Sequence, residues 1–106
     1  MKTVNYSIRV QNTSGFPSTA ISITLHINSG APITFTANQI VPYVATSEDD
    51  IFLISYTATY NGQPVNCQGT DTDYSGGPVR SKLIVIKLEL NAAGNGLKPG
   101  ITVWPD

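Results

Sequence analysis

Apolar and polar side chains alternate along most of this chain, and the longest apolar stretch covers residues 79–90, VRSKLIVIKLEL. Successive side chains of a β-strand point to opposite faces, so a period of two indicates a strand. Residues 83–86 are apolar on both faces, which predicts that the middle of this strand lies between two layers and that both ends reach water. Its β-branched residues and the turn signals at 76–78 and 91–100 favour a strand over a helix.

Further alternating segments are predicted as strands at residues 3–10, 20–28, 32–37, 51–60, 63–70 and 101–104. Residues 38–50 are predicted to be a connection with a short apolar patch at Ile40 and Val41, where Pro42 limits any strand to a sheet edge. About seven strands and no convincing helix indicate an all-β chain that forms one domain over residues 1–106. The predicted fold is an antiparallel, hairpin-rich β-sandwich, with a small barrel as the alternative.

The first predicted hairpin turns at residues 28–31. Matching the apolar faces of its two strands places Leu25 opposite Phe35 and Ile27 opposite Ile33. One register therefore satisfies both strands.

The second predicted hairpin turns at Asn61-Gly62, the favoured dipeptide where both central residues need positive φ. This turn sets Tyr56 opposite Cys67, so that apolar residues meet across the pair. Pro64 lacks an N–H, which predicts that its strand is an edge near the turn.

Charge and composition narrow the range of partners. Six basic and seven acidic residues give a net charge of −1, which provides no basic surface for nucleic acid or an acidic membrane. Charged residues make up 12% of the chain, whereas about 25% is typical, and Ser, Thr and Asn replace them. That composition is common in secreted binding modules, toxins and particle subunits, so an extracellular or particle-associated location is expected.

The sequence also argues against several other classes. No signal peptide or transmembrane segment is expected, because Met1 leads directly into an alternating pattern. Cys67 is the single cysteine and falls on an apolar face, where cysteine acts as a small hydrophobic residue. His26 is the only histidine and points outward, without a nucleophile that it could activate. Zinc would need more His or Cys, and the chain is predicted not to be an enzyme.

Five of the seven acidic residues are predicted to meet at the open end of the second hairpin, because its register brings Asp50 beside Asp73. Clustered carboxylates repel one another unless a cation neutralises them, and Ca²⁺ takes about six to eight oxygen ligands. One hypothesis is therefore a calcium site, and the other is a pair of solvated acidic loops. The candidate ligands are Glu48, Asp49, Asp50, Asp71 and Asp73.

The segment Gly69-Thr70-Asp71-Thr72-Asp73-Tyr74 resembles part of the acidic loop of small bacterial lectins that bind fucose or mannose through two calcium ions. The match covers these six residues. The resemblance implies a β-sandwich in which sugar hydroxyls coordinate the metals directly, with Asp71 and Asp73 at ligand positions.

Exposed aromatic rings offer a metal-independent way to bind sugar, through stacking on a pyranose ring. Tyr43 and Tyr74 are expected in loops and Trp104 lies near the C-terminus, so these three are the candidate ligand-binding aromatics. For Trp104 the alternative is packing in the core. The remaining aromatics on predicted core faces are Tyr6, Phe35 and Tyr56.

Three functional classes follow from these observations. The first is a non-enzymatic, lectin- or adhesin-like module that binds carbohydrate, with calcium as its one candidate cofactor. The second is a self-assembling subunit of a fibre, coat or crystalline body, indicated by edge strands without the charges that normally prevent pairing. The third is a small membrane-acting toxin. The acidic cluster and the loop aromatics favour the binding module.

Overall fold

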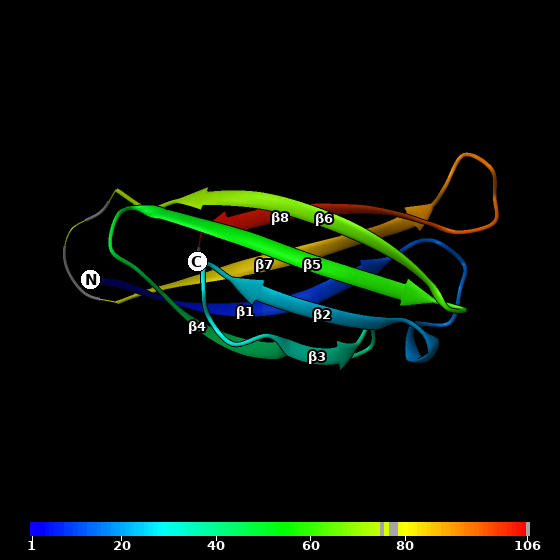
Figure 1. Ribbon diagram of the computed structural model, residues 1–106, viewed down its shortest axis with the longest axis horizontal. Coiled ribbons are helices and arrows are strands. Elements are labelled where there is room, and N and C mark those ends of the chain that lie inside the picture. Colours follow the sequence, from blue (N-terminus) through cyan, green and yellow to red (C-terminus); the bar gives the residue numbers. More distant parts are fainter. Residues whose placement is uncertain (75, 77–78, 106) are drawn as a thin grey trace.

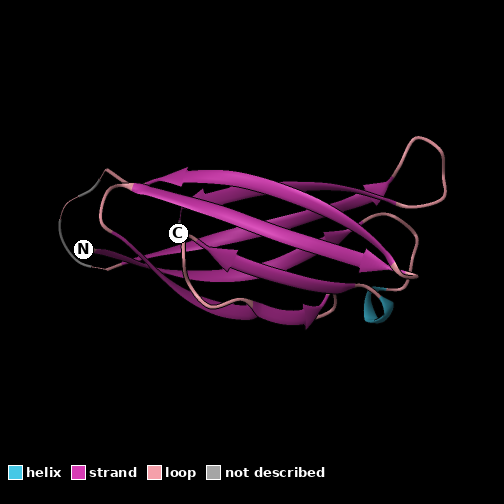
Figure 2. Cartoon of the chain, viewed as in Figure 1, coloured by secondary structure: helices cyan, strands magenta, loops and turns pink. Residues whose placement is uncertain are grey.

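The computed structural model describes residues 1–74, 76 and 79–105, whose strands form two sheets packed face to face (Figure 1). Strands dominate the chain, and one short 3-10 helix, η1, precedes the second strand (Figure 2). In chain order the elements are β1 (Lys2–Asn12), η1 (Ser18–Ala20), β2 (Ser22–Ile27), β3 (Ile33–Thr36), β4 (Val41–Ser47), β5 (Ile51–Tyr60), β6 (Gln63–Thr72), β7 (Arg80–Leu90) and β8 (Leu97–Pro105).

The first sheet has the strand order β4-β1-β7-β8, and the second has the order β3-β2-β5-β6. The predicted all-β sandwich is thereby confirmed. Neighbouring strands run antiparallel except for β1 and β7, which run parallel from Val4 beside Arg80 to Asn12 beside Leu88. Parallel neighbours need a long crossover, and here the chain from β2 to β6 supplies it.

The core lies between the two sheets, where alternate side chains of every long strand meet. Tyr6 and Phe52 pack edge to face across it, with ring centroids 6.0 Å apart. The largest fully buried side chains are Val4, Ile8, Ile21, Ile23, Leu25, Ile27, Phe52, Ile54, Ile84, Ile86 and Leu88.

The prediction that the middle of β7 is covered on both faces is wrong. Ile84 and Ile86 face the second sheet and are fully buried. Leu83 and Val85 alternate with them and are only partly buried, because they face away from the second sheet. The outer face of the first sheet therefore carries apolar side chains at the surface.

The β5–β6 hairpin has the predicted register, with Tyr56 opposite Cys67. Asn61 and Gly62 have φ values of 54° and 75°, which are the positive angles that this two-residue turn requires. β6 is also an edge strand, as Pro64 predicted. Local turn chemistry was sufficient to define this element.

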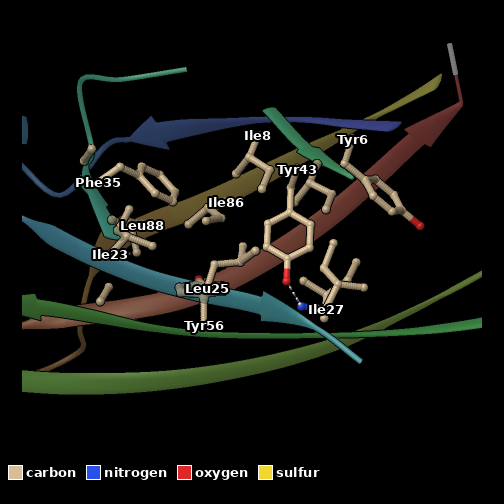
Figure 3. Close-up of a cluster of buried hydrophobic side chains, with 14 of the residues drawn as sticks. Tyr6, Ile8, Ile23, Leu25, Ile27, Phe35, Tyr43, Tyr56, Ile86 and Leu88 are labelled. Carbon is tan, nitrogen blue, oxygen red and sulfur yellow. Dashed lines mark hydrogen bonds between the residues drawn. The ribbon is translucent and has the colours of Figure 1, made fainter. Parts of the chain in front are cut away.

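The first hairpin is displaced by two residues from its predicted register: Ile23 rather than Leu25 faces Phe35, and Leu25 rather than Ile27 faces Ile33. The Tyr43 hydroxyl enters this turn and accepts a hydrogen bond from the Ile27 N–H at 3.2 Å (Figure 3).

The same Tyr43 hydroxyl donates to the Ala31 carbonyl at 2.8 Å. The hydroxyl therefore bridges the backbone of Ile27 and Ala31. Next to the turn, the pairing of β2 with β3 begins at Leu25 and Ile33. Tyr43 itself belongs to β4, an edge strand in a segment for which a connection was predicted.

Candidate functional site

The acidic residues gather partly as predicted. The Asp73 N–H donates to the Asp50 carbonyl at 2.9 Å, so these two residues are neighbours at one end of the sandwich. A cleft of about 390 Å³ opens there, which we call the end cleft. It is lined by Met1, Lys2, Thr3, Glu48, Asp49, Asp50, Asp73, Gly76, Val79 and Arg80.

Groups of the protein itself engage the carboxylates of the end cleft. Lys2 Nζ lies 2.8 Å from Asp50 Oδ1 and also donates to the Asp73 backbone carbonyl. Asp49 Oδ1 accepts hydrogen bonds from the Ile51 N–H and from the Ser47 hydroxyl, each at 2.9 Å. These two bonds lower the pKa of Asp49, because they favour the ionised carboxylate.

Asp71 does not reach the end cleft. It is buried between the sheets, where its Oδ2 lies 2.9 Å from Lys82 Nζ and accepts a hydrogen bond of 2.7 Å from the Tyr6 hydroxyl. Burial, followed by the hydrogen bond to Asp71, raises the pKa of Tyr6. Asp71 is thus engaged in an inter-sheet ion pair, which joins β6 to β1 and β7.

The predicted calcium ligands do not assemble into one cage. Among the described residues, no group of three or more His, Cys, Asp or Glu side chains is arranged to hold a metal ion. The inward turn of Asp71 is one reason, and the engagement of Asp49 and Asp50 by neighbouring donors is another. The geometry therefore gives calcium no support as a cofactor.

The three candidate aromatics have different environments. Tyr43, expected in a loop, lies in β4 with only 7% of its surface exposed, and its ring is not available for stacking. Because proline restricts strand formation, Pro42 led to the prediction of a connection at residues 38–50 instead of this strand. Tyr74 is 78% exposed in the connection after β6, next to the Asp73 of the end cleft.

Trp104 is 52% exposed, so its ring is not packed in the core. It lies opposite Leu83 in the β7–β8 ladder and shares the outer face of the first sheet with that residue. Beside it is an open hollow of about 400 Å³, which we call the Trp104 hollow. The hollow is lined by Arg9, Val10, Gln11, Val85, Lys87 and Trp104.

Strand order assembles the Trp104 hollow from three strands. Arg9 of β1 pairs with Val85 of β7, and Gln11 pairs with Lys87. Lys87 in turn lies opposite Gly100 of β8, which contributes no side chain. The result is a shallow site with an aromatic wall, an apolar floor at Val85 and polar groups that project from the strands.

Sequence reasoning identified Trp104 but missed Arg9, Gln11 and Lys87. Alternation places Arg9 on the polar face of its strand and Lys87 on the same face of its strand as Leu83 and Val85. The missing information was that β1 and β7 are neighbours, since nothing in either strand reveals a parallel pairing.

His26 and Cys67 are separated by the second sheet. His26 lies opposite Ser55, whereas Cys67 lies opposite Tyr56, so their side chains point to opposite faces. His26 Nδ1 is 3.0 Å from the Asn28 carbonyl oxygen. This histidine is therefore not placed to activate the thiol.

Comparison of the chain with protein-family models, curated proteins and solved structures finds no significant match. Within residues 1–74, 76 and 79–105, no helix is long and apolar enough to cross a membrane. Functional inference therefore rests on the chemistry of the two sites.

Proposed function

We propose that this protein is a non-enzymatic carbohydrate-binding module and that the Trp104 hollow is its ligand site. The observation that carries the proposal is the half-exposed Trp104 on the outer face of the first sheet, beside an open hollow. A large aromatic side chain usually buries most of its surface. Its exposure next to hydrogen-bonding groups is typical of a binding surface.

The chemistry of the hollow suits a pyranose ring. The C–H face of such a ring is apolar and stacks on an indole, while its rim of hydroxyls needs hydrogen-bond partners. The Gln11 amide can both donate and accept, and Arg9 and Lys87 donate. Stacking would provide most of the affinity, and these three side chains would orient the sugar.

The test is isothermal titration calorimetry of the wild type and of Trp104→Ala against a panel of oligosaccharides. Trp104→Ala is expected to lose about 2 kcal/mol, or roughly 30-fold in affinity, as truncation of a central aromatic does. Leu53→Ala is the matched control, because Leu53 is 55% exposed but belongs to the second sheet. Equal affinities for the two variants would refute the assignment of the site.

The calcium-assisted form of this function, expected from the sequence, is checked in the same titrations. Repeating them in EDTA and in millimolar Ca²⁺ separates binding by the Trp104 hollow from a contribution of the end cleft. Because none of the described residues that line the hollow is a carboxylate, we expect equal affinity in both. A loss of affinity in EDTA would instead indicate that the acidic residues of the end cleft contribute to binding through a metal ion.

A self-assembling subunit is the second candidate, and edge strands favour it. β4 contains no charged residue, and the single charge of β6, Asp71, points into the core. Natural edges usually carry outward charges that prevent pairing between molecules. This function predicts a mass that rises with concentration in light scattering, and Gln68→Lys on β6 should abolish the rise. A constant monomer mass would contradict it.

A further inference from the structure

Basic residues gather on the face that bears the Trp104 hollow. Three of the six basic residues of the chain, Arg9, Lys87 and Lys98, project from the outer face of the first sheet. The acidic residues lie mostly at the end cleft, and Glu89 is the one acidic residue that the described strands place on this outer face. The described strands therefore place three cations and one carboxylate on the outer face, whereas the end cleft is lined by four carboxylates and two cations, Lys2 and Arg80.

The register shows which of these cations has a charged neighbour. Lys98 lies directly opposite Glu89, at a spacing that allows opposite charges to interact. Arg9, by contrast, lies beside Val85, and Lys87 lies between Gln11 and Gly100. Their direct cross-strand neighbours carry no charge, and the nearest carboxylate along β7 on this face is Glu89, two residues from Lys87 and opposite Lys98. Among the described residues, those that line the hollow include two cations and no carboxylate.

We infer that the ligand of the Trp104 hollow is an anionic saccharide, one that carries carboxylate or sulfate groups. The inference rests on the proposed carbohydrate-binding function and goes beyond it by assigning the ligand a charge. A guanidinium presents two parallel N–H groups to a carboxylate or sulfate, and the Lys87 ammonium adds a second positive charge. Trp104 holds the sugar ring while Arg9 and Lys87 select its acidic substituent.

The low charge of the whole chain does not oppose this selection. A net charge of −1 is nearly neutral, and charges beyond a Debye length of about 10 Å are screened at 0.1 M salt. Arg9 and Lys87 line the hollow itself, and the nearby Glu89 lies opposite Lys98, whose charge offsets its own.

The experiment titrates Trp104 fluorescence with three hexasaccharides at low and high ionic strength. Hexagalacturonate carries carboxylates, a heparin-derived hexasaccharide carries sulfates, and maltohexaose is neutral. We expect at least one anionic chain to bind about 10-fold more tightly than maltohexaose at low salt, with the difference shrinking as salt rises. Comparison of the two anionic chains identifies the preferred acid group.

Two substitutions test the residues. Arg9→Gln with Lys87→Gln should remove the preference, so that the anionic chains bind no more tightly to this variant than maltohexaose does. Lys98→Gln is the control, because it removes one charge from the same face outside the hollow, and the preference should persist. Thermal melts verify that each variant is folded.

Two results would overturn the inference in distinguishable ways. If maltohexaose binds as tightly as the anionic chains, the carbohydrate-binding function stands and the assignment of charge fails. If none of the three perturbs Trp104 fluorescence and calorimetry detects no binding of the wider panel, the proposed function fails with it.

Discussion

At the scale of single residues, the buried Tyr6–Asp71–Lys82 cluster links the two sheets. Lys82 and Asp71 are each nearly inaccessible to water, and both Asp71 oxygens lie within 3.1 Å of the ammonium. A buried ion pair stabilises little overall, but removal of one partner leaves an uncompensated charge and costs about 3–5 kcal/mol. The cluster therefore joins β6 to β1 and β7 across the core, and loss of either charged partner should destabilise the sandwich.

Tyr6 and Tyr56 lead to a prediction at alkaline pH. Burial is the main cause that raises the pKa of both hydroxyls, and the Tyr56 hydroxyl also donates to the Gly100 carbonyl at 2.7 Å. In the unfolded chain each phenol ionises near pH 10. The native state then holds more protons, so stability is intact below about pH 10 and falls above it, by roughly 1.4 kcal/mol per pH unit for each tyrosine.

The measurement is urea unfolding between about pH 9 and pH 11, across the phenol pKa in unfolded chains. Tyr6→Phe should be less stable at neutral pH, because Asp71 loses a donor, but its stability should fall less steeply above pH 10. Tyr74→Phe, at an exposed position, should retain the slope of the wild type. A Tyr6→Phe slope equal to that of the wild type would rule out this account.

At the scale of elements, Tyr43 of β4 connects to both sides of the turn between β2 and β3 through hydrogen bonds with Ile27 and Ala31. Tyr43→Phe leaves the buried Ile27 N–H without its acceptor, at a cost of about 1–3 kcal/mol. Gly30 lies against the hydroxyl: a Cβ there would collide with it and come within 3.0 Å of the Ile27 carbonyl oxygen. Gly30→Ala should therefore cost less when the hydroxyl is absent.

A double-mutant cycle of Gly30→Ala and Tyr43→Phe, followed by denaturant unfolding, tests this contact. We expect a coupling of about 0.5–3 kcal/mol, as for residues that touch. Gly100→Ala is a suitable control partner for Tyr43→Phe, because its Cβ would make only an ordinary contact of 3.5 Å with Lys87. Additive effects in the Gly30 cycle would show that the hydroxyl does not define the turn.

The two hairpins show how far local sequence can predict an element. The Asn61-Gly62 dipeptide readily adopts the positive φ that a two-residue turn requires, so the β5–β6 register could be predicted from these two residues. The turn after β2 depends instead on Tyr43, a residue from a third strand. The sequence of residues 20–37 does not show that a hydroxyl from another strand enters the turn. Matching the apolar faces alone therefore predicted a register that is wrong by two residues.

At the scale of the whole molecule, strand order creates the candidate site. The sandwich is elongated, 45 × 21 × 18 Å, with the end cleft near the N-terminus and the Trp104 hollow on one broad face. Arg9 and Lys87 are distant in sequence and adjacent in space because β1 and β7 run side by side. Alternation predicted the face on which each residue lies, but it carries no information about which strands become neighbours.

The acidic residues illustrate the same limit. The predicted proximity of Asp50 and Asp73 follows from one hairpin and is confirmed by their backbone contact. The inward turn of Asp71 depends on Lys82 in the opposite sheet, which no single hairpin reveals. The position of Asp71 therefore depends on a contact between the two sheets, whereas that of Asp50 and Asp73 depends on one hairpin.

The most direct test of the central claim is acrylamide quenching of Trp104, the only tryptophan in the chain, during titration with neutral and anionic hexasaccharides. Its ring is half-exposed, so quenching of the free protein should be efficient. A sugar stacked on the indole should protect it in a saturable manner. If quenching remains unchanged across the whole panel while the protein stays folded, Trp104 does not form a carbohydrate-binding surface.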